Sequence, residues 1–313
     1  MNILVTGGAG YIGSMVCRRL LHEGHAVTAY DSLVMGGQGL LGLWDLPSFT
    51  FIKGDIRDAD DTHKVCRDKE IIIHLAALVG ESQCKRNVQD TEDINFLATW
   101  RIANQAKAIG AQFIFASTCS NYGISEHEEL VDEDSELKPL SLYAETKIRA
   151  ENEVLKIAND DFKPLILRFA TAYGLSPRMR FDLLLNEFVR DAITDNYVLV
   201  YGASSWRPFV HVYDIARFIH RAIRRNLSGV FNVGGDNLRK SDIIVELQRL
   251  EPDLDIDIKE GKIDPRNYRV DFTRARREGF IPMFKPSDGI RSIADALRSG
   301  LFADPHSKAY RNG

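Results

Sequence analysis

Short apolar runs alternate with amphipathic stretches through the first half of the chain. Spacing at the helical period predicts helices at Tyr11–Glu23, Ala59–Arg67, Thr91–Ile109 and Leu142–Asn159. Strands this apolar, separated by helices, are typical of a parallel sheet covered on both faces. We therefore predict a doubly wound (Rossmann) α/β fold that binds its ligands at the carboxyl ends of the strands. The predicted strands are Asn2–Thr6, Ala26–Asp31, Phe49–Lys53, Ile71–Leu75, Gln112–Ala116 and Leu165–Phe169.

The pattern changes after about residue 170. Only two short runs, at 197–201 and 229–233, are typical of strands. We predict a cofactor-binding domain at residues 1–172, with 206–235 packing back on it, and a smaller, mainly C-terminal substrate-binding lobe at 173–313. An acidic run at 126–136 is predicted to be a solvated loop without a binding role. Helices are predicted near Asp182–Ile193, Tyr213–Arg225, Ser241–Leu250 and Asp288–Arg298.

Composition narrows the class of protein. The chain is 44% hydrophobic and 27% charged, with a net charge of −4, which gives no support to nucleic-acid or anionic-membrane binding. The longest apolar run is shorter than the ~18 residues that a membrane span needs, and the N-terminus lacks a signal-peptide pattern. We expect a cytoplasmic protein with reduced thiols, because no C-x-x-C spacing links Cys17, Cys66, Cys84 and Cys119.

A glycine motif follows the first predicted strand and opens the first predicted helix. Gly8-x-Gly10-x-x-Gly13 has this context, and Gly7 gives the variant spacing with Gly10 and Gly13. Such glycines allow a tight turn and close approach of the backbone to a pyrophosphate at the helix N-terminus. Asp31 ends the second predicted strand, where a carboxylate accepts hydrogen bonds from a ribose diol and repels a 2′-phosphate. The motif and Asp31 therefore predict binding of NAD rather than NADP. The alternative is that the glycines form a turn that binds no ligand, and the position of Asp31 makes this less favoured.

Tyr143 and Lys147 lie four residues apart in a predicted helix, and therefore on one face. A tyrosine with a pKa near 10 is a poor base at neutral pH, but a neighbouring ammonium stabilises the phenolate. Such a pair can take a proton from a sugar hydroxyl while hydride leaves the same carbon. The pair carries weight because it follows the glycine motif and Asp31 along the chain.

Other catalytic signatures are weak. The chain has no G-x-S-x-G elbow for a hydrolase and no G-x-x-x-x-G-K-[ST] loop for phosphoryl transfer. His22 and His25 have no third ligand nearby in the sequence, so no metal site is predicted. His74 and His211 are predicted to be core or anchoring residues.

Several segments together resemble one enzyme family. "TGGAGYIGS", "GDI", "HLAA", "STCSNYG", "YAETK" and "RPFVHVYDIA" are similar to extended short-chain dehydrogenases/reductases, specifically the NAD-dependent nucleotide-sugar epimerases and dehydratases. The likeness covers nearly the whole chain. "ALVGESQCKRN" and "FATAYGLSPRMRFDLLLNEFV" resemble the branch that oxidises C4 of GDP-linked heptoses.

The resemblance implies a role for each matching residue. Thr118 would hydrogen-bond the C4 oxygen with help from Ser120, Tyr143 would be the base, and Lys147 would also hold the nicotinamide ribose. Arg207, with Arg180, Asn186 and Arg266 as weaker candidates, would contact the substrate's diphosphate. The implied NAD-binding residues, which also include Tyr143 and Lys147, are Gly7, Gly10, Tyr11, Ile12, Gly13, Asp31, Asp55, Ile56, Leu75, Ala76 and Ala77.

The chain departs from the family pattern directly after Thr118. Dehydratases place an Asp-Glu pair there to protonate the leaving hydroxyl, but this chain has Cys119 and Ser120, neither of which is a competent acid at neutral pH. Cys119 is also one residue out of register with the cysteine of 3,5-epimerising members, so we predict that it is packed rather than nucleophilic. The roles of Cys84 and Glu81 near the predicted site stay open.

The prediction is therefore NAD-dependent oxidation at C4 of a nucleotide-diphosphate sugar, by a 4-epimerase or a net 4-dehydrogenase. The alternatives are a 4,6-dehydratase and a non-catalytic NAD-sensing protein on the same fold. The resemblance also implies a homodimer that pairs through helices Thr91–Ile109 and Leu142–Asn159.

Overall fold

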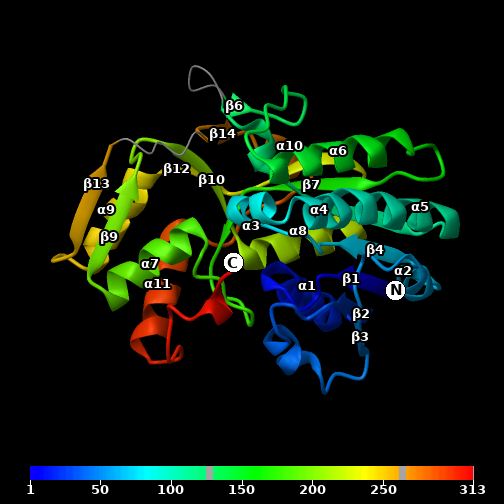
Figure 1. The fold of residues 1–313 in the computed structure, drawn as a ribbon, viewed down its shortest axis with the longest axis horizontal. Helices are drawn as coiled ribbons and strands as arrows, with labels where there is room; N and C mark the ends of the chain where they lie inside the picture. Colours follow the sequence, from blue (N-terminus) through cyan, green and yellow to red (C-terminus); the bar gives the residue numbers. More distant parts are fainter. Residues whose placement is uncertain (125–129, 261–265, 313) are drawn as a thin grey trace.

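The computed structural model describes residues 1–124, 130–260 and 266–312 (Figure 1). A seven-stranded sheet with helices on its faces occupies the right of Figure 1, and a smaller lobe lies on the left. The strand order is β11-β7-β5-β4-β1-β2-β3, and every neighbouring pair is parallel. This confirms the doubly wound α/β fold. The strands are β1 (Asn2–Thr6), β2 (Ala26–Asp31), β3 (Phe49–Lys53), β4 (Ile71–His74), β5 (Gln112–Thr118), β7 (Leu165–Phe169) and β11 (Gly229–Val233).

The sheet is buried on both faces because alternate side chains point to opposite sides. Ile3 and Val5 of β1 belong to one hydrophobic core, and Leu4 between them belongs to another. The first core includes side chains of the paired helices α1 (Tyr11–His22) and α8 (Val212–Arg224). The second includes side chains of α2 (Ala59–Cys66), α5 (Thr99–Ile109) and α6 (Leu142–Lys156).

The helix predicted over Thr91–Ile109 is not a uniform α-helix. Residues Glu92–Ala98 form a π-helical segment between α4 (Val88–Thr91) and α5. Asn95 lies inside this segment and is fully buried, and its side chain bonds both the N–H (2.8 Å) and the carbonyl (2.9 Å) of Leu78. A π-bulge of this kind is frequent at functional sites, and here it lets one side chain fix the chain that follows β4.

The lobe contains more strands than the sequence pattern predicts. Besides β9 (Tyr197–Tyr201), the second half forms β8 (Thr171–Tyr173), β10 (Trp206–His211), β12 (Asp236–Arg239), β13 (Asp255–Lys259) and β14 (Arg269–Val270). They pair in the orders β12-β10-β8, β13-β9 and β14-β6, the last with β6 (Leu130–Val131). The prediction of only two strands in this half was wrong, because these strands are short and carry many polar residues. The remaining helices are α3 (Glu81–Arg86), α7 (Leu184–Thr194), α9 (Lys240–Leu250), α10 (Thr273–Arg277) and α11 (Pro286–Arg298), and 3₁₀ turns occur at Gln38–Leu43, Cys119–Tyr122 and Lys308–Tyr310.

The acidic run at 126–136 is not wholly a solvated loop. Its residues 126–129 lie outside the described part of the chain, but Glu133 is buried. The Glu133 carboxylate accepts a 2.7 Å hydrogen bond from the Asn232 N–H and lies 3.4 Å from the Arg274 guanidinium. The prediction of a solvated loop was therefore wrong at Glu133, which joins this segment to β11.

None of the helices in the described ranges combines the length and the apolar character needed to cross a membrane. The division of the chain at residue 172 stays a prediction, since one hydrophobic core continues from the sheet into the lobe.

Candidate active site

A cleft of about 690 Å³ lies at the carboxyl ends of the sheet strands, between the sheet and the lobe. Residues from the loop after β1, from the ends of β2, β4 and β5, from the start of α6 and from the lobe line it. Parallel strands bring these segments together because their carboxyl ends meet at one edge of the sheet. The predicted site residues that line the cleft are Gly7, Gly10, Tyr11, Ile12, Gly13, Asp31, Asp55, Ile56, Leu75, Ala76, Ala77, Thr118, Ser120, Tyr143, Lys147, Arg180, Arg207 and Arg266.

The glycine loop turns from β1 into α1 where a side chain would not fit. Gly7 has a φ of +71°, and a Cβ there would lie 2.8 Å from the Ala76 nitrogen. A Cβ on Gly13 would collide with the Gly7 carbonyl oxygen. These close approaches between the loop, β4 and α1 require glycine.

The start of α1 is available to an anion. Its N-cap is Gly10, which supplies no side-chain hydrogen bond to the first turn. The backbone N–H groups of a first turn lack partners within the helix and carry a partial positive charge. This end of α1 therefore fits a phosphate group in the cleft.

Asp31 is held in place by two backbone groups. Its carboxylate accepts hydrogen bonds from Ala9 (3.0 Å) and Leu33 (2.8 Å). Burial raises its pKa, and those hydrogen bonds oppose the shift. Asp55, which also lines the cleft, pairs with Arg57 at 2.6 Å, and the hydrogen bond from Arg57 lowers the pKa of Asp55.

Arg178 is a positively charged cleft residue that the sequence analysis did not single out. Its side chain is buried, and Nη2 donates to the Arg311 carbonyl at 3.0 Å. Its buried Nε has no hydrogen-bond partner within the ranges that the structure describes. Burial lowers the pKa of Arg178 to about 10, because a charge in this place is poorly solvated. A guanidinium with one unpartnered N–H, in the same cleft as an uncapped helix N-terminus, fits a dinucleotide's pyrophosphate.

Thr118 ends β5 and begins the turn that the sequence "STCSNYG" forms. Its hydroxyl accepts a 3.1 Å hydrogen bond from the Ser120 N–H, which orients the side chain at the cleft. Cys119 points away, is 1% exposed, and contacts the Arg168 carbonyl through its sulfur at 3.2 Å. Burial raises the pKa of the Cys119 thiol, so it is an inert packed residue, as predicted.

Tyr143 and Lys147 occupy the first turns of α6, whose N-cap Ser141 accepts a hydrogen bond from Ala144. The buried Lys147 ammonium donates to the Ala116 carbonyl at 2.9 Å. Burial lowers the pKa of Lys147 to about 7, and the Glu151 carboxylate opposes that shift.

The pKa of Tyr143 is shifted by other groups than the sequence analysis expects. Burial raises its pKa, and the cation that counteracts this shift is Arg180 rather than Lys147. The expected effect of Lys147 on the Tyr143 phenol is therefore not seen in this structure. The Lys147 ammonium is instead engaged by a strand carbonyl.

Two of the residues predicted to contact the diphosphate, Arg207 and Arg180, already have bonding partners within the protein. Arg207, on β10, is buried and donates to the carbonyls of Trp206 (2.8 Å) and Arg266. Arg180 forms a two-pronged pair with Asp182, at 3.0 and 2.8 Å. Both guanidinium groups line the cleft, and the charge of Arg180 is paired with Asp182, which lines the cleft as well.

Asn186 does not line the cleft, unlike the other predicted substrate residues. It is fully buried on α7, where Nδ2 donates to the Arg180 carbonyl (2.9 Å) and the Tyr11 hydroxyl (3.3 Å). Its Oδ1 accepts from the Gly174 N–H at 3.0 Å. These bonds hold Asn186 behind the cleft lining, next to Arg180 and Tyr11, and its contact with the substrate stays a prediction.

His74 and His211 are structural residues. His74 bonds the hydroxyls of Thr6 (2.8 Å) and Thr99 (3.0 Å) through its two ring nitrogens. His211 accepts from the Tyr213 N–H at 3.2 Å and stacks on Phe284. Both observations confirm their interpretation as anchoring residues.

Cys84 and Glu81, whose roles the sequence analysis did not assign, lie in different environments. Cys84 is buried, with its sulfur 3.5 Å from the Leu78 carbonyl. Glu81 lines the cleft and pairs with Lys85 at 2.5 Å.

Asn312 is among the cleft residues that sequence reasoning missed. Its N–H donates to Asp182 at 3.1 Å, and its Oδ1 is buried without a partner among the described residues. No sequence motif marks this position, because only the fold brings it to residues 178–182.

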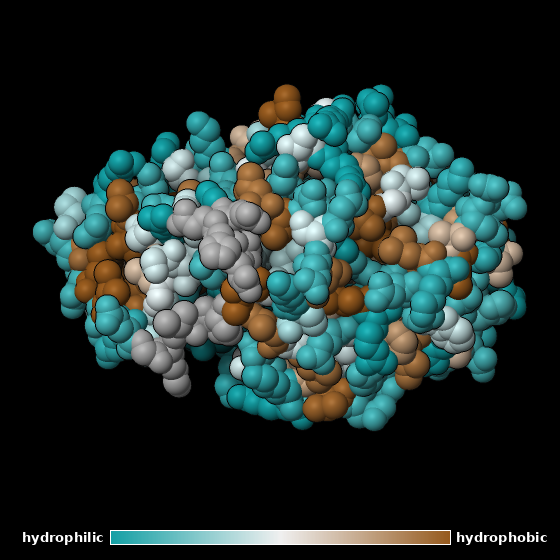
Figure 2. All heavy atoms as spheres, turned by 90° about the horizontal axis from the view of Figure 1, so that it is seen from above, coloured by the Kyte–Doolittle hydropathy of each residue, from teal (hydrophilic) through white to brown (hydrophobic). Residues whose placement is uncertain are grey.

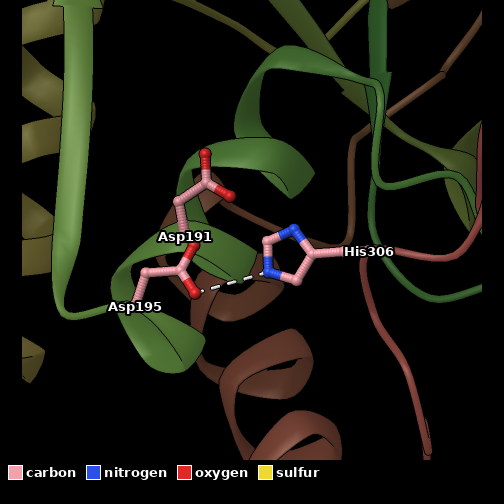
Figure 3. Close-up of side chains that lie close together, drawn as sticks. All are labelled: Asp191, Asp195 and His306. Atoms are coloured by element: carbon pink, nitrogen blue, oxygen red, sulfur yellow. Dashed lines mark ion pairs between the residues drawn. The ribbon is translucent and has the colours of Figure 1, made fainter.

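Three possible metal ligands lie together outside the cleft (Figure 3). His306 Nε2 lies 3.4 Å from an Asp195 carboxylate oxygen, and Asp191 accepts a 2.7 Å hydrogen bond from Arg190. Both carboxylates thus already pair with basic side chains, and we assign no metal to this group.

Comparison with known proteins shows the family of the chain. The model of the NAD dependent epimerase/dehydratase family matches residues 3–234. The chain is 32% identical to the dTDP-glucose 4,6-dehydratase of Streptomyces griseus over 92% of each chain. It is 29% identical to the low-salt glycan biosynthesis protein Agl12 of Haloferax volcanii, over 94% of this chain and 98% of the relative.

A solved structure gives the same result. The UDP-glucuronic acid 4-epimerase of Bacillus cereus, crystallised with UDP-glucuronic acid and NAD, superposes with a TM-score of 0.85 at 28% identity. The match covers 96% of this chain and 100% of that one. The chain therefore belongs to the NAD-dependent epimerase/dehydratase family, as an enzyme of the extended short-chain dehydrogenase/reductase type with NAD as its cofactor.

Proposed function

We propose that this enzyme oxidises C4 of a nucleotide-diphosphate sugar and releases either the 4-epimer or the 4-keto sugar. One observation carries the proposal: Thr118, Tyr143 and Lys147 line the same cleft as the glycine loop and Asp31. A hydroxyl, a phenol and an ammonium are the groups that alcohol oxidation needs beside a hydride acceptor. The non-catalytic alternative has no support in a chain of this enzyme family that retains all three groups.

The residues that would hold NAD are those of the glycine loop, with Asp31 toward a ribose and Arg178 toward the pyrophosphate. When bound, NAD supplies the acceptor for the C4 hydride and the donor for its return. By the family resemblance, Asp55 and Ile56 would contact the adenine of NAD. The Asp55 carboxylate forms an ion pair with Arg57.

Tyr143 would act as the general base. Its phenolate oxygen would take the proton of the C4 hydroxyl as that carbon becomes a ketone, and the resulting phenol would return it when the ketone is reduced. Because burial raises the pKa of Tyr143, its phenolate needs nearby positive charge, and the cation that lowers this pKa on this chain is Arg180. Thr118 donates a hydrogen bond to the C4 oxygen and keeps it beside the phenol.

The substrate would lie on the lobe side of the cleft. Arg207 and Arg266 suit a diphosphate, because guanidinium groups bind phosphate oxygens through paired hydrogen bonds. By their printed names, the relatives described above act on dTDP- or UDP-linked sugars. The finer resemblance to GDP-heptose C4-dehydrogenases stays a prediction.

A 4,6-dehydratase is the second candidate, because the chain is 32% identical to such an enzyme. Elimination needs an acid for the C6 hydroxyl, yet the two positions after Thr118 are an inert buried thiol and the Ser120 hydroxyl. This difference favours chemistry confined to C4.

A panel of UDP-, GDP-, CDP- and dTDP-sugars followed by NMR tests the proposal. A returned C4 stereoisomer supports a 4-epimerase, and a ketone or its hydrate supports a 4-dehydrogenase. A 4-keto-6-deoxy product would contradict the proposal and establish the dehydratase.

We also propose a homodimer that pairs through the π-helical segment, α5 and α6. Leu97 and Trp100 are each 42% exposed and Leu155 is 40% exposed. Figure 2 shows hydrophobic residues among polar ones on the right of the face seen from above, the side on which α5 and α6 lie in Figure 1. Gel filtration with light scattering tests this, and a monomer would contradict it.

A further inference from the structure

A second cavity, of about 290 Å³, lies between α1, α8 and the chain at 279–281. It shares no lining residue with the active-site cleft. Its lining is strongly basic: Arg19, Arg217, His220, Arg221, Arg224 and Arg225, completed by Gly279, Phe280 and Ile281.

Three of the five arginines pair with carboxylates. Arg19 lies 2.5 Å from Glu23 and Arg217 lies 2.7 Å from the buried Asp214. The third pair joins Arg225 to Glu278 at 3.0 Å.

The other two arginines have no ion pair with any carboxylate in the described ranges. Arg221 donates through Nε to the Glu278 carbonyl at 2.5 Å, so its guanidinium is held but not neutralised. Arg224 is exposed at the cavity and adds a second positive charge. The cavity therefore keeps about two uncompensated positive charges, beside a nearly buried His220.

The fold holds Arg221 in this place. Gly279 has a φ of +76°, and a Cβ there would collide with Nη2 of Arg221. Phe280 follows and packs edge-on against Phe218 of α8, with ring centroids 5.0 Å apart. The Arg221 guanidinium thus lies against Gly279 and is held by the Glu278 carbonyl.

The helix dipole alone does not account for this cluster. Arg221 and Arg224 in the last turn of α8 do offset the partial negative charge of that helix end. However, that role needs one or two exposed cations, and like charges gathered around one cavity repel each other. A bound anion would remove the repulsion and use the paired donors of guanidinium groups.

We propose that this cavity is a second binding site, separate from the active site, for a small phosphate oxyanion such as inorganic diphosphate. Its size suits a phosphate group or two rather than a whole nucleotide sugar. The anion would lie among Arg221, Arg224 and Arg19 and would tie α1 to α8.

The test is calorimetric titration of the NAD-loaded full chain with inorganic diphosphate at constant ionic strength. The substitutions Arg221→Gln and Arg224→Gln together remove the two unneutralised charges, and neither residue lines the active-site cleft. The control pair Arg249→Gln and Arg291→Gln lowers the net charge equally at two exposed sites. Because both proteins keep the cleft intact, any diphosphate that binds there contributes equally to them.

We expect the dissociation constant of the second site to rise about tenfold or more in the Arg221/Arg224 variant and to stay unchanged in the control pair. The single variant Arg224→Gln should weaken binding without affecting folding, since this exposed side chain has no bond to another described residue. Equal binding by wild type and the Arg221/Arg224 variant, equal loss in the control pair, or no second site in wild type would each overturn the proposal. So would tungstate-soaked crystals with an anomalous peak in the active-site cleft alone.

Discussion

The carboxylate of Glu151 on α6 lies 2.7 Å from the Arg168 guanidinium on β7, and both side chains are almost fully buried. The same carboxylate accepts hydrogen bonds from Asn121 (2.8 Å) and from Ser117, the residue before Thr118. Glu151 also lies one helical turn beyond Lys147 and opposes the lowering of its pKa. One ion pair therefore supports both the Thr118 turn and the charge of Lys147.

Replacing this carboxylate should affect catalysis through Lys147. In Glu151→Gln, the pKa of Lys147 should fall further, so the alkaline limb of the kcat/KM profile should move to lower pH. Arg168 would lose its buried counter-charge, at a cost of about 3–5 kcal/mol in the free energy of unfolding. The exposed pair of Glu153 and Lys156 on the same helix provides the control Glu153→Gln, which should change neither quantity. An unmoved profile in Glu151→Gln would show that Glu151 does not act on Lys147.

The lowered pKa of Lys147 has a consequence for stability. Folded Lys147 has a pKa of about 7, whereas an unfolded lysine titrates near 10.4. Between these values the unfolded chain binds more protons, so the free energy of unfolding should rise with pH across this window. Urea unfolding of wild type and Lys147→Met from pH 6 to 10 checks this, because the variant lacks this contribution. The difference between them should change by about 2–5 kcal/mol across the window, and a constant difference would be inconsistent with a buried, neutralised lysine.

The glycine loop should not accommodate a single added methyl group without a local shift of the backbone. In Gly13→Ala, the new Cβ would meet the Gly7 carbonyl, so α1 and the loop must separate. We expect a loss of about 1–3 kcal/mol in stability and a rise of about tenfold or more in the dissociation constant of NAD. Gly42 has open space around its Cβ position, so Gly42→Ala is the matched control and should leave NAD binding unchanged. NAD binding of wild-type strength in Gly13→Ala would refute this geometry.

Arg178 should matter for NAD binding but not for folding. Removing its buried, incompletely bonded guanidinium in Arg178→Met should weaken NAD binding about tenfold. The protein without NAD should be no less stable, because burial disfavours the charge. Fluorescence titration with NAD and urea unfolding measure the two effects, with Arg249→Met as an exposed control. Unchanged NAD affinity would remove Arg178 from the cofactor site.

The sheet and the cofactor end of the cleft could be predicted because their signals are local. Asn2–Thr6 and the other sheet strands are continuous apolar runs, and the glycine motif lies within a single turn. β10 was missed because Arg207, Pro208 and His211 interrupt its apolar pattern. The π-helical segment depends on the contact between Asn95 and Leu78, which no local pattern encodes.

The lobe side of the cleft was harder to predict, because it too depends on contacts between segments that are distant in the sequence. Asn186 has the right residue type and a suitable position in the sequence, yet bonds to Tyr11 and Gly174 hold it beneath the site. Asn312 and Arg178 both line the cleft because the C-terminal segment packs on the loop after β8, through the bonds Arg178–Arg311 and Asn312–Asp182.

The most direct test of the account is turnover by Tyr143→Phe with the nucleotide sugar that the panel identifies. Thr118, Lys147 and the glycine loop remain in place in this variant, so NAD should bind within about twofold of wild type while kcat falls about 10²- to 10⁴-fold. Turnover at the wild-type rate would contradict the assignment of Tyr143 as the base.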